Sequence, residues 1–519
     1  MKFEYECIDS LPPLAWLAAV NFERGDVHAC GGRSVSFADN WIFEGAWAGQ
    51  YERGEFRTAE TSFGSGLFVD KDCVVLSPPT STLECVYYYV ADKSTILMSN
   101  TLVGLTSTAG DRPRIDQTNY LRLFESARFG LDHYKAEIPM VHGTVRRVFY
   151  HSLVFQKRRS PSRWPRPAAF ACDDFSAYRW YIKRQLALVA ANAQAVQRTV
   201  KYPLLSTISS GYDSPTIAVL ASELGCTEAV SLGKARAQFG HADDSGAEIA
   251  QHLGMAVSLY DRLAYLGHAK RYEAQFLSTG VGGEDIVFAS FGSKLAGRCV
   301  LTGFLGDKVW GLDDPNLGLS LARADNGGGS LGEYRLDTDF IHVPCPYIGV
   351  LAQPSIQKIS RSDEMQRWRI GGDYDRPIAR RIIETAGIDR TAFGRDKKAV
   401  TQAIGLPHTF SFDQFPEDVA DAYRSFQREQ KFDPNALSRD PSFRRYSAEY
   451  VVTRFIWRKR SLPLWAKRMT TSAECALSLT EPVHGDYALL WQWSVSVRRS
   501  AYAAVERGSR RWSGDLAPR

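Results

Sequence analysis

The sequence predicts an α/β chain in two parts: a β-rich first domain, then a domain built on a doubly wound parallel sheet. Its 519 residues are about three to four times the usual domain size, so at least two cores are expected. Short apolar-alternating runs broken by Gly, Pro and Asp-Lys turns fill the first ~155 residues, which is typical of strands. From about residue 203, apolar runs alternate with helical patterns of about ten residues, which indicates parallel strands joined by helices.

The composition is that of an ordinary folded protein. A hydrophobic share of 44% and a charged share of 23% argue against disordered, collagen-like and coiled-coil chains. The formal net charge of +5 is small for this length, so it offers no general footprint for nucleic acid or anionic lipid. We therefore expect neither a nucleic-acid partner nor a membrane partner.

The nine cysteines are odd in number and scattered, without a CxxC pair. This pattern favours reduced thiols over a disulfide framework or a structural zinc site. Met1-Lys2-Phe3 leads into acidic residues, and no apolar stretch is long enough to cross a bilayer. We therefore expect a cytoplasmic protein. The ten histidines are also scattered and include no HExxH, so a catalytic transition-metal site is not expected.

In the first domain the expected strands cover residues 66–69, 72–76 and 85–90. The stretch 157–167 follows, and its three prolines and five basic residues predict that it cannot continue a sheet or a helix. We interpret it as a solvated connection between the two parts. The resulting boundaries are 1–160 for the first domain, 161–172 for the linker and 173–519 for the second domain.

The second domain begins with a helix from Phe175 to about Gln197, followed by a strand at 203–208. A loop then leads to a helix from Pro215 to Leu224, for which Ser214 is the expected N-cap and Pro215 the first helical residue. The later expected elements are strands at 229–232, 256–260 and 299–302, a helix at 244–253 that includes Gly246, and mainly helices from about residue 350.

Two loops follow strands of this sheet, at the edge where open α/β sheets bind ligands. Ser209 to Ser214 combine small side chains, one glycine and a helix N-terminus, so backbone N–H groups and hydroxyls can converge on a phosphate. Asp213 would repel that phosphate unless a cation such as Mg²⁺ lies between them. Asp307 ends another strand and can complete the Mg²⁺ site. Each loop alone also suits a helix cap or a turn, and the pair of loops is what indicates a nucleotide site.

The first loop, Ser209-Ser210-Gly211-Tyr212-Asp213-Ser214, resembles the S-G-G-x-D-S pyrophosphate loop of the asparagine synthetase family. The segment 302–307 resembles that family's later S-G-x-G-x-D-E segment. Weaker resemblances lie at Arg395-Asp396-Lys397 (the family's Arg-x-Lys), at 342–347 (its proline-containing substrate segment), and at 64–68 and 97–100 (its amidotransferase half).

The resemblance implies a PP-loop synthetase domain with an adenine nucleotide α-hydrolase-like fold, preceded by an Ntn-type amidotransferase-like domain. It implies ATP-dependent activation of a carboxylate as an acyl-adenylate, then attack of an amine to form an amide. ATP and Mg²⁺ are the implied cofactors, and small-molecule or peptide carboxylates and amines the implied substrates.

The resemblance also implies the site residues. The implied nucleotide contacts are Ser209, Ser210, Gly211, Asp213, Ser214 and Gly303 around the phosphates, with Leu232 and Gly233 at the adenine. Asp213 and Asp307 would hold Mg²⁺, and Lys397 would act with Asp213 in catalysis by offsetting charge at the α-phosphate.

The sequence also departs from the family. A glutamine-hydrolysing member needs a terminal cysteine, but Met1 is followed by Lys2, and Cys7 would serve only after an unusual cleavage. We therefore expect an amine other than glutamine-derived ammonia, as in the β-lactam synthetases and lasso-peptide cyclases, with the first domain as an inert scaffold. Ser210 replaces a loop glycine, and Lys308 stands where Glu is expected, so an ammonium beside Asp307 could replace the metal or repel it.

Two alternatives remain open. One is a binding or regulatory module that keeps the nucleotide pocket without the chemistry. The other is a nucleotide- or tRNA-modifying relative of the same loop class, which predicts a basic face that a net charge of +5 does not supply.

Two further motifs are set aside. Residues 327–332 match G-x-G-x-x-G but follow a polar segment, so we interpret them as a flexible loop. Glu284-Asp285 and Asp363-Glu364 are interpreted as solvated surface, although Glu284 and Glu364 could recruit a substrate amine.

Overall fold

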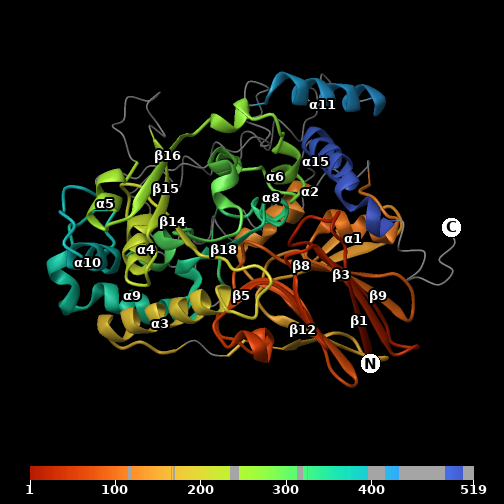
Figure 1. Cartoon of the computed structure of the whole chain (residues 1–519), viewed down its shortest axis with the longest axis horizontal. Helices are drawn as coiled ribbons and strands as arrows, with labels where there is room; N and C mark the ends of the chain where they lie inside the picture. The colour runs from red at the N-terminus through yellow and green to blue at the C-terminus, as the bar shows by residue number, and fades with distance from the viewer. Residues whose placement is uncertain are drawn as a thin grey trace.

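The computed structural model describes residues 1–114, 120–164, 166–167, 170–233, 245–312, 320–323, 325–372, 374–394, 415–431 and 485–506. Figure 1 shows the two parts side by side, with β-rich structure in the red and orange first part and mixed α/β structure in the yellow to cyan part. In the described residues, no helix is both long enough and apolar enough to span a bilayer.

The first part contains two packed β-sheets. Their strands are β1 (Lys2–Cys7), β2 (Trp16–Asn21), β3 (Asp26–Gly31), β4 (Ser36–Ala38), β5 (Trp41–Trp47), β6 (Ser62–Val69), β7 (Cys73–Ser77), β8 (Val86–Val90), β9 (Thr95–Ser99), β10 (Glu137–Pro139), β11 (Thr144–Val148), β12 (Ser152–Gln156) and β13 (Ser162–Trp164). The sheets have the orders β1-β3-β2-β9-β8-β11-β10 and β13-β12-β7-β6-β5-β4. Apolar side chains from both sheets share one core. The β-rich first part is therefore confirmed.

The prediction that residues 157–167 cannot continue a sheet is wrong. Ser162–Trp164 forms strand β13, which pairs antiparallel with β12 at the sheet edge, where proline-flanked strands are tolerated. Arg166 is buried, and its guanidinium donates to the carbonyl oxygens of Tyr150, Phe56, Ala59 and Pro78. This segment therefore belongs to the packed first part rather than to a solvated connection.

The second part is built on a parallel sheet, as predicted. Its strands are β14 (Leu204–Thr207), β15 (Glu228–Gly233), β16 (Ala256–Asp261), β17 (Arg298–Thr302) and β18 (Phe340–Pro344). They lie in the order β16-β15-β14-β17-β18, and all neighbours are parallel. The chain moves outward from β14 to β16 and then returns to β17 on the other side of β14. The strand order therefore reverses between β14 and β17, where doubly wound sheets bind ligands.

The described helices are α1 (Leu102–Ala109), α2 (Tyr120–Glu125), α3 (Phe175–Ala193), α4 (Asp213–Ser222), α5 (Ala247–His252), α6 (Glu273–Leu277), α7 (Gly306–Val309), α8 (Gly332–Thr338), α9 (Gln353–Arg361), α10 (Pro377–Thr385), α11 (Glu417–Glu429) and α15 (Gly485–Arg498). The helix predicted from Phe175 is α3, which ends four residues earlier than expected. Beyond β18, the described residues contain helices and no strand, as the sequence predicted.

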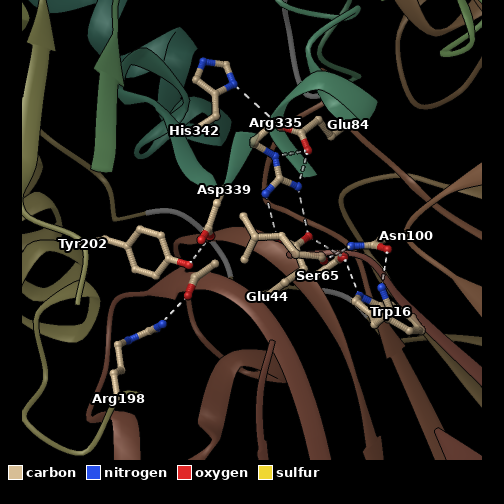
Figure 2. A network of polar contacts seen from close by, with 12 residues as sticks. Trp16, Glu44, Ser65, Glu84, Asn100, Arg198, Tyr202, Arg335, Asp339 and His342 are labelled. Atoms are coloured by element: carbon tan, nitrogen blue, oxygen red, sulfur yellow. Dashed lines mark hydrogen bonds and ion pairs between the residues drawn. The ribbon is translucent and has the colours of Figure 1, made fainter. Parts of the chain in front are cut away.

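A buried polar network joins the two parts, and Figure 2 shows it at close range. Arg335 of α8 donates from Nη1 to Oε2 of Glu44 in β5 at 2.7 Å, and from Nε and Nη2 to Oε2 of Glu84 at 2.9 and 2.7 Å. We call these three residues the Arg335 joint. Nearby, Asp339 accepts hydrogen bonds from Tyr202 and from Ser34 of the first part. The two parts are therefore joined by buried ion pairs and hydrogen bonds.

Candidate functional site

The two predicted loops meet at the edge of the parallel sheet. They follow β14 and β17, which are direct neighbours. A Cβ built on Gly303 would lie 2.7 Å from the Cβ of Asp213, and one built on Gly306 would lie 2.4 Å from Asp213 Oδ1. The second loop therefore packs its bare backbone against Asp213, and Asp307 follows directly at the start of α7. The predicted convergence of the two loops is confirmed.

The first loop is held by its own serines. The hydroxyls of Ser209 and Ser214 share a hydrogen bond of 2.7 Å, and the Gly211 N–H donates to Ser209 Oγ at 3.3 Å. The prediction that Ser214 is an N-cap is wrong, because α4 begins at Asp213 and the Ser214 side chain bonds within the loop instead.

Gly246 also supports this loop. It was predicted inside a helix, but it has φ +63° and precedes α5. A Cβ on Gly246 would lie 2.7 Å from the backbone carbon and oxygen of Ser209, so glycine is needed there both for the dihedral angle and for the close contact.

Tyr212, at the variable position of the motif, fixes the first loop to neighbouring segments of the second part. Its ring is buried and lies 4.9 Å from the ring of Tyr374 and 5.8 Å from that of Phe393, measured between centroids. Arg380 donates a hydrogen bond to its hydroxyl. The Gly394 N–H donates to the Ser210 carbonyl oxygen at 2.9 Å. The segment ending at Gly394 is therefore part of the loop's support.

Arg376, which the sequence analysis missed, forms an ion pair with Asp213. Burial lowers the pKa of Arg376, but the charges of Asp213 and then Asp307 outweigh it, so the pKa lies above its ordinary value. The guanidinium therefore lies where a cation between the two carboxylates was expected. No sequence signal links Arg376 to Asp213, because the two residues are 163 positions apart.

Of the other residues singled out in the sequence, Leu232, Gly233 and Lys308 lie within the described residues and Lys397 does not. Leu232 and Gly233 end β15, the neighbour of β14 on the side away from β17. Lys308 lies in α7, directly after Asp307. Lys397, with Arg395 and Asp396, lies outside the described residues.

The donors gathered at this edge suit a polyphosphate. They are the Gly211 N–H, the Ser209 and Ser214 hydroxyls and the Arg376 guanidinium, each of which would exchange its present partner within the chain for a phosphate oxygen. A Cβ on Gly211 would meet only Ser209 Oγ and Tyr374 Oη, both at 3.5 Å, so packing within the chain does not require glycine there. Glycine would be required at this position if a ligand approached the Gly211 N–H closely.

The acidic residues suit Mg²⁺ bound jointly with phosphate oxygens. Asp213 and Asp307 supply the oxygen ligands that this ion prefers. Across the part of the chain that the structure describes, no three or more His, Cys, Asp or Glu side chains gather as a ligand set. An ion held here would therefore take its remaining ligands from phosphate and water, as Mg²⁺ commonly does.

The junction of the two parts encloses a cavity of about 60 Å³. It is lined by side chains from both parts, including Glu84, Phe124, Arg147, Val281, Gly329 and Arg335. Asn100, in the segment that resembles an amidotransferase, accepts from the Trp16 N–H and donates to the Leu14 carbonyl oxygen, and it also lines this cavity.

Residues 327–332 and the Glu284-Asp285 pair lie together. The Glu284-Asp285 pair is buried, so its interpretation as solvated surface is wrong. The Asp285 carboxylate accepts from the N–H groups of Gly328 and Ser330 at 2.8 and 3.0 Å, and from the Ser330 hydroxyl at 2.7 Å. The glycine-rich loop thus binds a carboxylate of its own chain.

No protein-family model matches the chain, and no curated protein matches it. The interpretation of the site therefore depends on the geometry of its residues.

Proposed function

We propose that the chain is an ATP-dependent carbon–nitrogen ligase, which adenylates a carboxylate with release of pyrophosphate and couples it to an amine. The observation that carries this proposal is the contact of Gly303 and Gly306 with Asp213 at the reversal point of the sheet. That contact gathers two carboxylates, hydroxyls and an N–H where doubly wound sheets bind ligands.

The proposal assigns a role to each residue. Ser209, Ser210, Gly211 and Ser214 would bind the phosphates, Asp213 and Asp307 would hold Mg²⁺, and Leu232 and Gly233 would lie against the adenine. ATP with Mg²⁺ supplies the adenylyl group that activates the carboxylate. Lys397, three residues beyond Gly394 in the sequence, would offset charge at the α-phosphate. Arg376 would exchange Asp213 for a phosphate oxygen.

The amine would come from a small molecule or a peptide. Support comes from the first part of the chain, where Asn100 is bonded to backbone and Arg335 fixes Glu44 and Glu84. These polar side chains hold the fold together, which fits a scaffold without glutaminase activity.

The test uses radiolabelled ATP, Mg²⁺ and mixed pools of amino acids, dicarboxylic acids and short peptides, with AMP and pyrophosphate measured. We expect equal amounts of both products from at least one pool. Asp213→Ala should lower the rate by about 100-fold or more, since a charge-positioning group is lost. Asp421→Asn, at an exposed site on α11, is the matched control and should leave it unchanged. Product formation that Asp213→Ala does not alter would overturn the proposal.

The ion pair between Arg376 and Asp213 favours one alternative, a nucleotide-binding module without the chemistry, because the guanidinium already occupies a metal ligand. Titration with the α,β-methylene analogue of ATP separates the two. Binding without AMP formation in any pool supports the module, whereas absence of binding excludes both.

A further inference from the structure

Four buried polar side chains meet where α2, α15 and two loops of the second part come together. They are Glu125, Glu284, Asn326 and Tyr487, each between 3% and 8% exposed. Asn326 Nδ2 donates to Glu125 Oε1 at 3.2 Å, and both Glu125 and Glu284 raise the pKa of Tyr487, after burial itself. We call these four residues the Glu284 cluster.

Three polar atoms of this cluster have no hydrogen-bond partner among the described residues. They are Glu284 Oε2, Asn326 Oδ1 and the Tyr487 hydroxyl. The neighbouring Asp285 is equally buried, yet its two oxygens take three hydrogen bonds from Gly328 and Ser330. The fold can therefore satisfy a buried carboxylate at this place, and it leaves Glu284 Oε2 without a partner among the described residues. Buried polar groups without partners in a native fold call for a ligand or a water.

The unpartnered atoms specify the chemistry of that ligand. The carboxylate and amide oxygens only accept hydrogen bonds, and a tyrosine hydroxyl can accept one. Burial, and then the charge of Asp285, raise the pKa of Glu284 to about 8, so the carboxylate form is favoured at neutral pH only when a cation is bound beside it. A ligand that donates several hydrogen bonds and carries a positive charge matches this environment, and a primary ammonium group has three N–H donors.

Residues next to the cluster in the chain contact both the interdomain cavity and the second loop. Phe124, Val281 and Gly329, which are close to the cluster in sequence, line the cavity. On the other side, Cβ atoms on Gly327 and Gly328 would lie 3.8 and 3.2 Å from the ring of Phe304. Phe304 belongs to the second loop, between Gly303 and Gly306.

We propose that the Glu284 cluster is a binding site for a primary ammonium group. This deepens the proposed function by naming where the amine substrate would be held, and it depends on that function only for this role. The ammonium would donate to Glu284, Asn326 and Tyr487, and its charge would be balanced by Glu284 and Glu125.

The experiment measures the thermal unfolding midpoint of the full chain without nucleotide. The probe is methylammonium chloride, compared at equal concentration with tetramethylammonium chloride, which has no N–H donor, and with potassium chloride. We expect methylammonium to raise the midpoint by about 2 °C or more above both other salts. Glu284→Gln and Tyr487→Phe should each abolish the difference, whereas Glu137→Gln, at an exposed site on β10, should keep it.

Equal midpoints in the three salts would overturn the proposal, and would indicate that Glu284 is protonated and bonded within the cluster. A methylammonium effect that survives both cluster variants would overturn it too. Each variant's midpoint in potassium chloride reports whether it folds. Because no nucleotide is present, failure of the ligase proposal leaves this result unchanged, and the reverse also holds.

Discussion

Two of the arginine–carboxylate sites in the chain have similar chemistry and opposite character. In the Arg335 joint the side chains of Arg335 and Glu44 are 3% and 1% exposed. At the candidate site, Arg376 is 6% exposed, but its partner Asp213 is 28% exposed. A buried pair cannot exchange partners without leaving a charge in the protein interior, whereas a pair with one solvated carboxylate can. The Arg335 joint therefore holds the two parts of the fold together, whereas the ion pair between Arg376 and Asp213 can open to a ligand.

The largest expected effect is at the joint. Arg335→Met leaves Glu44 and Glu84 buried without their cation, and should lower the free energy of unfolding by about 3–5 kcal/mol. Urea unfolding followed by tryptophan fluorescence measures it. Arg424→Ala, which breaks the exposed pair with Asp421, should change stability by less than about 0.5 kcal/mol. If Arg335→Met lowered the free energy of unfolding by less than about 1 kcal/mol, the Arg335 joint would not differ in stability from the Arg376–Asp213 pair.

Acid should weaken the same joint. Burial favours the neutral form of Glu84, but Arg335 and then His342 outweigh it and hold the pKa of Glu84 at about 2. A lowered pKa stabilises the fold above the ordinary value near 4.5, and this stabilisation is lost as pH falls from there toward 2. At Glu44, burial outweighs Arg335 and raises the pKa, so Glu44 does not add to this loss.

The measurement is stability against pH for the wild type and for Glu84→Gln. The gap between them should shrink by about 3 kcal/mol between pH 6 and pH 2. A constant gap would show that the charge of Glu84 is not what stabilises the joint.

A smaller effect on stability, with a clear effect on binding, is expected at the glycine contact. Gly306→Ala places a Cβ against Asp213 and should separate the two loops, with a destabilisation of about 1–3 kcal/mol. Binding of the α,β-methylene analogue of ATP should weaken by about tenfold or more, as calorimetry would measure. Gly267→Ala has open space around its Cβ position and should bind as the wild type does. Equal affinities would mean that the loop contact does not shape the site.

The smallest effect on stability is expected at the ion pair between Arg376 and Asp213. Arg376→Ala leaves a carboxylate that water already reaches, so the free energy of unfolding should fall by only about 1 kcal/mol. Urea unfolding of Arg376→Ala and Arg335→Met under the same conditions compares the two losses of unfolding free energy. Losses of equal size in the two variants would contradict the distinction between a joint and an openable site.

Much of the fold was predictable because its signals are local. The strand at 203–208, the helix from Phe175 and the first loop follow from apolar periodicity and from small turn residues. Strand β18 was missed, since Pro344 and His342 obscure a short apolar run. Strand β13 was missed because prolines flank it, and an edge strand tolerates them.

The site was predictable only in part. The convergence of Asp213 with the second loop followed from one rule, that parallel strands end at one edge of a sheet. Arg376 could not be found, because its partner is distant in sequence and its own surroundings carry no motif. The pair Glu284-Asp285 was assigned to the surface because adjacent carboxylates are usually exposed, whereas both side chains are buried here.

The sequence by itself determined that a β-rich part precedes a doubly wound sheet, and that two loops with an aspartate each lie at one edge of that sheet. These conclusions depend on local patterns and on strand direction. Only the tertiary structure decided which charges are paired: Arg376 with Asp213, Arg335 with two glutamates, and Glu284 with no cation among the described residues. Pairing depends on burial and on distances between residues far apart in the chain, and a linear pattern contains neither.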